Sequence, residues 1–246
     1  AGPADTAVGG FDGEPDHRSS GDPTGASTGE STVGMPGSVV ADMQSWHPSL
    51  TVSGVTLHGD RPGAAIAGYL DPRSLAVLST DNADAWSFKN SVAEELVHLA
   101  EVPVLLVGPK VPRRRPDGEI VVGYDGSASA RTALDSAVSL ARATGHRLWM
   151  VRVVPEPLAG DDLHESTTRP LQELAEQLDA EVGARWEVVQ SNSPVDAISS
   201  FADRRQAGFI VVGSRSRTDT SRRSMSSIAM GLVSSAEQPV LVTAIS

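Results

Sequence analysis

The residues best suited to chemistry lie in one stretch, VVGSRSRTDTSRRSMSS, at positions 211–227. An apolar strand runs into Gly213, and hydroxyl side chains and four arginines follow before a predicted helix begins at Ser226 and Ser227. Backbone N–H groups in a turn before a helix, together with arginines, can hold a phosphate group. The stretch therefore predicts an anion-binding loop, although little glycine remains in it.

This loop is a basic region of an acidic chain. The sequence has 246 residues and a formal net charge of −11, whereas residues 204–223 contain six arginines against one acid, Asp219. Binding to a nucleic acid polymer rewards an extended basic surface, so the acidic chain argues against nucleic acid as a partner. A local positive field on an acidic protein favours a small anion instead.

The composition sets the class of protein. Hydrophobic residues make up 39% of the chain and aromatic residues only 4%, which predicts a core of Val, Leu, Ala and Ile. The absence of cysteine excludes disulfides, thiolate metal sites and thiol catalysis. No apolar run approaches the roughly 18 residues of a membrane helix, and the chain does not open on a leader-like segment. We therefore expect a soluble cytoplasmic protein with no membrane partner.

The second part of the chain supplies the elements that must position the loop. Apolar runs alternate with segments of helical period from residue 119 onward, which predicts an α/β fold with a doubly wound parallel sheet. Asp125 and Gly213 both end predicted strands, so we expect them at the same edge of that sheet. The predicted strands are 119–126, 147–154, 184–190, 209–214 and 239–246, and the predicted helices are 127–145, 166–183, 193–208 and 226–238.

The first part repeats the later portion of this plan. VAEELVHLAEVPVLLV matches IAMGLVSSAEQPVLVT, and VGGFDGEPD near the start is a fainter match to VGYDGSAS. Such internal similarity indicates two related domains in tandem. The predicted elements are helices 37–48, 61–70 and 90–102 and strands 50–57, 74–79 and 103–109.

The first repeat is too short to be complete. Only residues 14–36, rich in glycine and serine, are available for a helix and a strand, so we expect a truncated sheet that depends on its neighbour. The predicted domains are a flexible, low-complexity segment with a remnant first strand (1–36), a degenerate first domain (37–112), a linker (113–118) and a complete second domain (119–246). The arginines at 113–115 are interpreted as part of a solvated linker.

Two motifs carry a resemblance to a known family. The strand that ends in Gly123-Tyr124-Asp125-Gly126-Ser127 is followed, much later, by Gly213 and a spaced Ser-Ser pair just before a helix and Pro-Val-Leu-Val. This pattern resembles the universal stress protein family in its tandem-domain form, most clearly over residues 119–246. The resemblance implies an adenine nucleotide α-hydrolase-like fold, a role in stress response, dimers through the last strand, and ATP binding in members that keep the motif's glycines.

The family motif is Gly-x-x-Gly, nine residues, then Gly-Ser or Gly-Thr. Here Gly213 matches the first glycine, Ser216 and Ser226 replace the other two, and Ser227 keeps the hydroxyl. The resemblance implies that Val153 contacts the adenine and Asp125 the adenine or ribose, with Mg²⁺ present only with the nucleotide. The residues it implies for an ATP site are Gly123, Tyr124, Asp125, Val153, Gly213, Arg215, Ser216, Ser226, Ser227 and Ile228.

The two serines weaken the predicted site. A non-glycine residue in the left-handed conformation costs on the order of 1 kcal/mol, and Cβ crowding adds to this, so the loss of affinity is roughly a hundredfold or more. Arg215 and Arg217 can offset part of it through charge-assisted hydrogen bonds. No glycine remains at the matching positions of the first domain (Ser79, Asn82, Asn90 and Ser91), where we expect no nucleotide.

No catalytic constellation stands out. The chain lacks a Gly-x-Ser-x-Gly elbow, and the acidic cluster GDDLHES at 160–166 is interpreted as a solvated loop rather than a metal site. Two functions remain: a non-catalytic stress-response regulator with a weakened ATP site, for which slow hydrolysis stays open, or a nucleotide-free scaffold that acts through protein partners. In both, the apolar last strands 103–109 and 239–246 should pair, as an intramolecular pseudo-dimer or as a homodimer.

Overall fold

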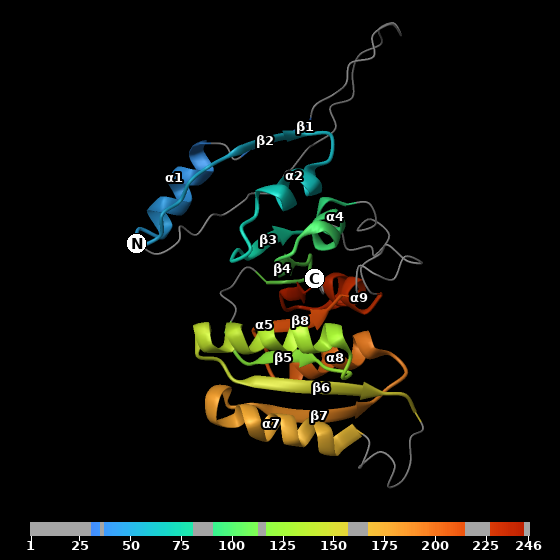
Figure 1. Cartoon of the computed structure of the whole chain (residues 1–246). Coiled ribbons are helices and arrows are strands. Elements are labelled where there is room, and N and C mark those ends of the chain that lie inside the picture. Colours follow the sequence, from blue (N-terminus) through green and yellow to red (C-terminus); the bar gives the residue numbers. More distant parts are fainter. Residues whose placement is uncertain are drawn as a thin grey trace, which may run out of the picture.

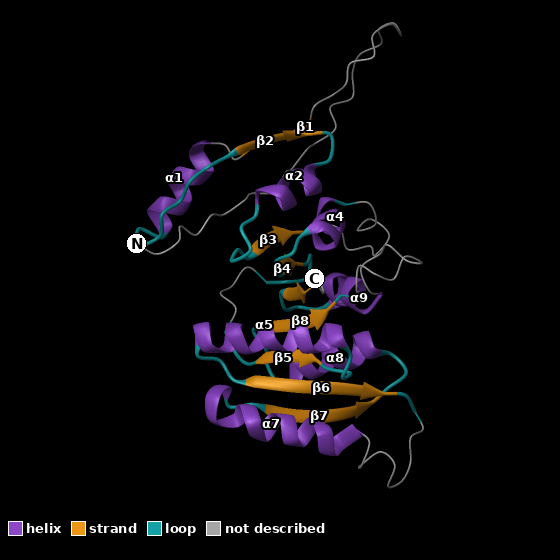
Figure 2. Ribbon diagram, viewed as in Figure 1, coloured by secondary structure: helices purple, strands orange, loops and turns teal. Residues whose placement is uncertain are grey.

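The computed structural model describes residues 31–34, 37–80, 91–112, 117–156, 167–214 and 227–243. Its second half (residues 117–243) alternates strands and helices as the sequence predicts (Figures 1 and 2). The elements are β5 (Ile120–Gly123), α5 (Ala128–Thr144), β6 (Leu148–Val154), α7 (Arg169–Val182), β7 (Arg185–Gln190), α8 (Pro194–Arg204), β8 (Phe209–Gly213), α9 (Ser227–Ser235) and β9 (Val240–Thr243).

The first half (residues 31–112) contains fewer sheet-forming elements. Its described elements are β1 (Ser31–Gly34), α1 (Gly37–Trp46), β2 (Thr56–Gly59), α2 (Pro62–Tyr69), β3 (Ala76–Ser79), α4 (Val92–Leu99) and β4 (Val104–Val107). The predicted remnant strand near residue 8 and residues 113–116 of the predicted linker lie outside the described residues.

The strands of both halves form one sheet. Its order is β3-β4-β9-β8-β5-β6-β7, and Figure 1 shows these strands stacked through the molecule. All neighbours are parallel except β4 and β9, which pair antiparallel with Leu105 opposite Leu241. The predicted α/β fold with a truncated first sheet is confirmed, and the two sheets meet edge to edge.

The pairing of β4 with β9 tests the predicted pairing of the last strands within one chain or between two chains. The last strands pair within the chain, as expected for an intramolecular pseudo-dimer. Each of them also has its own parallel neighbour, β3 for β4 and β8 for β9, so both edges of both strands are occupied. The prediction of a homodimer through these same strands is therefore wrong for this sheet, because neither β4 nor β9 has an unpaired edge.

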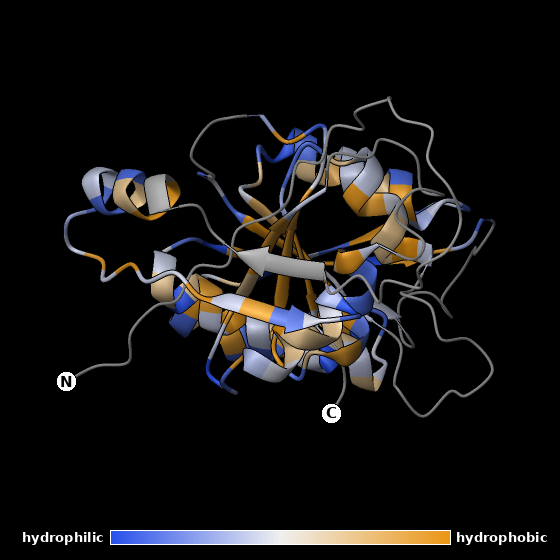
Figure 3. Cartoon of the chain, turned by 90° about the horizontal axis from the view of Figure 1, so that it is seen from above, coloured by the Kyte–Doolittle hydropathy of each residue, from blue (hydrophilic) through white to orange (hydrophobic). Residues whose placement is uncertain are grey.

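Helices cover the two faces of the sheet, and each face has its own core. Helices α5 and α7 pack on one face through residues such as Leu134 and Leu171. Helices α2, α4, α8 and α9 pack on the other through residues such as Leu96, Phe201 and Leu232. Strands buried on both faces must be apolar throughout, which explains their continuous Val/Ile/Leu runs. Figure 3 shows these apolar strands between the helical layers.

The sequence misplaced one strand of the first half. The sequence predicts a strand at 50–57, whereas β2 spans residues 56–59, so only residues 56 and 57 agree. β2 pairs antiparallel with β1 outside the main sheet. β1 itself falls in a stretch predicted to be loop. The cause is a missing neighbour: in the second half β7 pairs with β6, whereas the described first half contains no equivalent of β6.

The described helices include none that is long and apolar enough to cross a membrane.

Candidate functional site

The site predicted from the sequence lies where β5, β6 and β8 end. These three strands are parallel neighbours, with Gly123 opposite Val151 and Val122 opposite Val211. The N–H of Tyr124 extends this pairing by donating to the Val151 carbonyl at 2.9 Å. Their carboxyl ends therefore share one edge of the sheet, beside the starts of α5 and α9, which is where open parallel sheets bind ligands.

Asp125 forms the turn between β5 and α5. Its Oδ1 accepts a hydrogen bond from the Ser127 N–H at 2.9 Å, and the Ser127 Oγ in turn accepts from the Ala130 N–H at 3.2 Å. Gly126, between them, has a positive φ of 84°. Capping of this kind satisfies the free N–H groups of a helix start. Asp125 thus has a structural role, and its side chain is exposed at the edge of the sheet.

Gly213 is required for a reason that the sequence did not indicate. The sequence predicts it as a glycine of the phosphate loop's turn, but it is the last residue of β8 and has no positive φ. A Cβ on Gly213 would lie 2.4 Å from the Ser129 carbonyl oxygen. The glycine is needed because the first turn of α5 lies directly against the end of β8.

The apolar residues of the site divide between the two faces of the sheet. Val153 and Ile228 are partly buried and pack on the core beneath α8 and α9. Tyr124 packs on the opposite core, beneath α5 and α7. The face shared by Val153 and Ile228 is thus the one that could receive a flat apolar ring.

Helix α9 begins at Ser227, whose side chain is exposed. By its connection to β8, this helix start lies at the same edge of the sheet. The positive end of the helix dipole lies here, so this helix start favours a negatively charged group. The described site therefore includes Gly123, Tyr124, Asp125, Val153, Gly213, Ser227 and Ile228, whereas Arg215, Ser216 and Ser226 lie outside the described residues.

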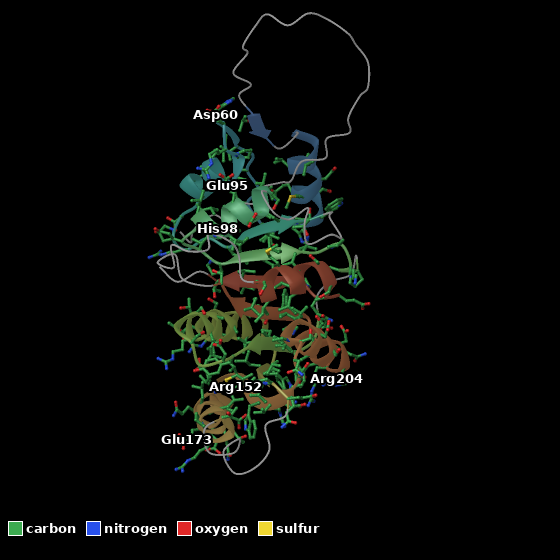
Figure 4. All side chains as sticks on the ribbon, turned by 90° about the vertical axis from the view of Figure 1, so that its right-hand side faces the viewer. Asp60, Glu95, His98, Arg152, Glu173 and Arg204 are labelled. Carbon is green, nitrogen blue, oxygen red and sulfur yellow. The ribbon has the colours of Figure 1, made fainter. Side chains whose placement is uncertain are left out.

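The sequence did not predict a ligand contact for two polar side chains that lie near the site. Thr243 lies opposite Gly213 in β9, is 2% exposed, and its Oγ1 has no hydrogen-bond partner in the described structure. Arg152, beside Val153 in β6, is partly buried and forms no ion pair with a described residue; Figure 4 labels it. The threonine gives no signal in sequence because β-branched residues are common in strands.

The corresponding edge of the first half is different. Ser79 ends β3 and Ser91 begins α4, where its Oγ accepts a hydrogen bond from the Glu94 N–H at 3.1 Å. No described strand or helix of the first half takes the places of β5, β6 and α5. Residues 81–90, which connect Ser79 to Ser91, lie outside the described structure. No three potential metal ligands cluster among the described residues of either half.

Comparison with known proteins agrees with this fold. The sequence profile of the Universal stress protein family matches residues 118–244. A universal stress protein from Archaeoglobus fulgidus DSM 4304 shares 24% identity over 69% of this chain and 60% of its own, with a TM-score of 0.54. A structure from Pseudomonas aeruginosa UCBPP-PA14, described under the same family name, shares 19% identity over 84% of this chain and 77% of its own, with a TM-score of 0.56.

The search of curated proteins found no match. The chain spans only about three fifths of the Archaeoglobus protein. At 24% and 19% identity, these two structures support the fold alone.

The fold and its edge define an α/β protein with a doubly wound sheet and a candidate ligand site at a strand-end switch point. Because the family profile covers more than half of the sequence, the chain belongs to the universal stress protein family.

Proposed function

We propose that this protein is a non-catalytic stress-response regulator whose second half binds an adenine nucleotide, ATP, with weakened affinity. The observation that carries the proposal is the convergence of Asp125, Val153 and Gly213 at one edge, next to the start of α9. The first half takes no part, because the described part of it lacks the two strands and the helix that would complete an equivalent site.

The base would lie on the apolar side of this edge. Val153 and Ile228 are partly buried on the same face of the sheet, so they offer an apolar surface to an adenine ring. The exposed carboxylate of Asp125 stands at the end of the neighbouring strand, where an oxygen can accept a hydrogen bond from the base or the ribose. These two features select a ring with a polar edge.

The phosphates would lie toward the start of α9. The helix N-terminus offers the positive end of its dipole, and Ser227 adds an exposed hydroxyl. Arg215 and Arg217 are close in sequence and would add charge-assisted hydrogen bonds. Mg²⁺ would enter with the nucleotide.

The proposed affinity is low because two glycines of the family motif are serines. Each serine forced into the left-handed conformation costs on the order of 1 kcal/mol, and its Cβ crowds the phosphates. The combined loss corresponds to roughly a hundredfold in dissociation constant. Restoring glycine should therefore strengthen binding.

Calorimetric titration of ATP with Mg²⁺ tests the proposal. We expect weak binding at one site per chain, and binding about a hundredfold tighter in the double variant Ser216→Gly/Ser226→Gly. Ser79→Gly is the matched control, since Ser79 ends the equivalent strand of the first half, and it should leave binding unchanged. Asp125→Asn should lower affinity while keeping the oxygen that accepts from the Ser127 N–H.

The alternative is a nucleotide-free scaffold, and one observation favours it. The large apolar side chains that are exposed in the described structure all come from residues 39–92, in the half without a nucleotide site. No binding of ATP to the wild type or to the double glycine variant would reject the nucleotide proposal and leave this scaffold role.

A further inference from the structure

Among the described strands, β3 is the last one on its side of the sheet. In the pairing of β3 with β4, the Ala76 N–H donates to the Pro103 carbonyl at 3.1 Å and the Thr80 N–H to the Val107 carbonyl at 2.9 Å. Alternate residues of a parallel strand direct their backbone groups to opposite sides, so those of Val77 and Ser79 point away from β4. No described strand pairs with them, because β3 is the last strand of the sheet.

Apolar side chains lie beside these outward-facing backbone groups. Leu75 and Val77 are 45% and 47% exposed, and their spacing of two places them on the same face of the sheet. The strip continues inward, since Val77 lies opposite Leu105 and Leu105 lies opposite Leu241. An exposed edge with apolar residues is a surface for pairing with another strand.

The opposite edge of the same sheet is protected. β7 carries Arg185 and Glu187, and Glu187 forms an ion pair with Arg205 at 3.8 Å. Charged side chains on an edge strand prevent unwanted pairing. Residues 74–80 of β3 and its flanks contain no charged residue and no proline. The two outer strands of the sheet therefore differ in charge.

We propose that β3 pairs antiparallel with β3 of a second copy of this chain, about a two-fold axis at Val77. An edge placed against its own copy is self-complementary, and the pairing closes at two chains. Pairing with β7 of another copy would instead extend indefinitely, and the charges on β7 oppose it. Antiparallel association of related strands already joins the halves of this chain at β4 and β9, one strand away.

The proposed pairing also reduces the exposure of the apolar side chains. With Val77 opposite Val77 of the second copy, the outward N–H and C=O groups of the two residues satisfy each other. The two valines become a cross-strand pair, and Leu75 comes opposite Ser79 of the second copy. Because β3 is only four residues long, the interface is small and the dimer should be weak. This proposal is independent of nucleotide binding.

Sedimentation of the full chain over a wide concentration range tests it. We expect a monomer–dimer equilibrium with a dissociation constant of roughly micromolar or weaker. Val77→Lys places like charges opposite each other and should weaken the dimer at least about a hundredfold. Val92→Lys is the matched control: Val92 is 39% exposed in the same half, but it lies on α4 and not in the strand that would pair, so the dimer should persist.

A second variant guards against a change in folding. Ser79→Pro removes an N–H that the sheet does not use within the chain, so it should block the dimer while circular dichroism stays unchanged. Hydrogen exchange at Val77 and Ser79 should slow as concentration rises. A wild type that stays monomeric at every concentration would overturn the proposal. So would a dimer that survives both Val77→Lys and Ser79→Pro, since its contact would then lie elsewhere.

Discussion

The two halves of this chain contain the same four-element unit in different surroundings. α2-β3-α4-β4 corresponds to α8-β8-α9-β9, with Pro62 matching Pro194 and Pro103 matching Pro239. In the second half β5 pairs with β8 and α5 packs over it, whereas the described first half has no such elements. The exposure of the equivalent valines differs accordingly, since Val211 is fully buried and Val77 is 47% exposed. The same local sequence therefore folds with and without its outer layer.

The helix crossing in the two units shows how the sequences have diverged. In the first half Glu95 of α4 lies against Gly63 of α2, where a Cβ would approach the Glu95 side chain to 2.7 Å. In the second half the sizes are reversed: Gly231 of α9 lies against Val195 of α8, also at 2.7 Å. The crossing has room for one side chain, and either helix can supply it.

Glu95 also changes the polar contacts at this crossing. Its Oε2 accepts a hydrogen bond from the Gly63 N–H at 3.0 Å, and its Oε1 lies 2.6 Å from Arg61. α2 has no side-chain cap of its own, whereas Ser193 caps α8. The larger residue of the first half thus provides the N-terminal cap from a neighbouring helix. Figure 4 labels Glu95 among the side chains of this half.

Alanine substitutions at Gly213 and Ser79 should show the largest difference in stability between the two halves. A Cβ on Gly213 would meet the Ser129 carbonyl of α5, and neither backbone can yield without separating helix from strand. Gly213→Ala should lower the free energy of unfolding by about 3 kcal/mol or more. Ser79→Ala, at the equivalent strand end, should change it by less than about 0.5 kcal/mol. Urea unfolding measures both, and equal losses would contradict the proposed role of α5.

The residue pair at the helix crossing of the second half can be introduced into the first half. Gly63→Val alone overpacks the contact with Glu95 and should cost about 2–3 kcal/mol. Adding Glu95→Gly recreates the pair found in the second half and should recover at least about 1 kcal/mol of that loss. The coupling comes from a double-mutant cycle in urea. Additive effects of the two substitutions would show that the sites do not share this space.

Burial of the two valines predicts a smaller contrast. Val211→Ala removes two fully buried methyl groups and should cost about 2 kcal/mol. Val77→Ala should cost less than about 0.5 kcal/mol in dilute solution, where the chain is monomeric. Thermal or urea unfolding at low concentration distinguishes them. A large cost at Val77 under these conditions would mean that another part of the chain already covers it.

The smallest effect is expected at Arg61. Its side chain is 69% exposed, so its ion pair with Glu95 is screened by water and salt. Arg61→Ala should change the free energy of unfolding by less than about 0.5 kcal/mol, because the hydrogen bond from Gly63 to Glu95 remains. Unfolding at low and high salt should show the small difference shrinking as salt rises.

The sequence predicted the second half well because its strands are apolar runs bounded by clear signals. β6, for instance, falls within the predicted strand 147–154, and Gly145 ends α5 with a positive φ of 73°. These features are local, so they can be recognised from the sequence alone. The antiparallel junction of β4 and β9 was also within reach, since both last strands repeat the same Pro-Val-Leu motif.

What the sequence did not reveal depends on contacts between distant residues. The pairing of residues 56–59 with β1 follows from a missing neighbour, which periodicity does not report. The close approach of Ser129 to Gly213 joins residues far apart in the chain, so the glycine was interpreted from its motif alone. In the candidate site, Thr243 became visible only once β9 lay beside β8.

The antiparallel junction between β4 and β9 has a consequence for how the first half persists. A fragment with so few buried residues would be marginal on its own, because small domains bury too little surface to fold stably. Its partner, however, is tethered to it through a connection of little more than ten residues. The docking is therefore unimolecular, with an effective concentration on the order of millimolar that dilution cannot reduce. Such a tether allows one half with fewer strands to remain a folded part of the protein.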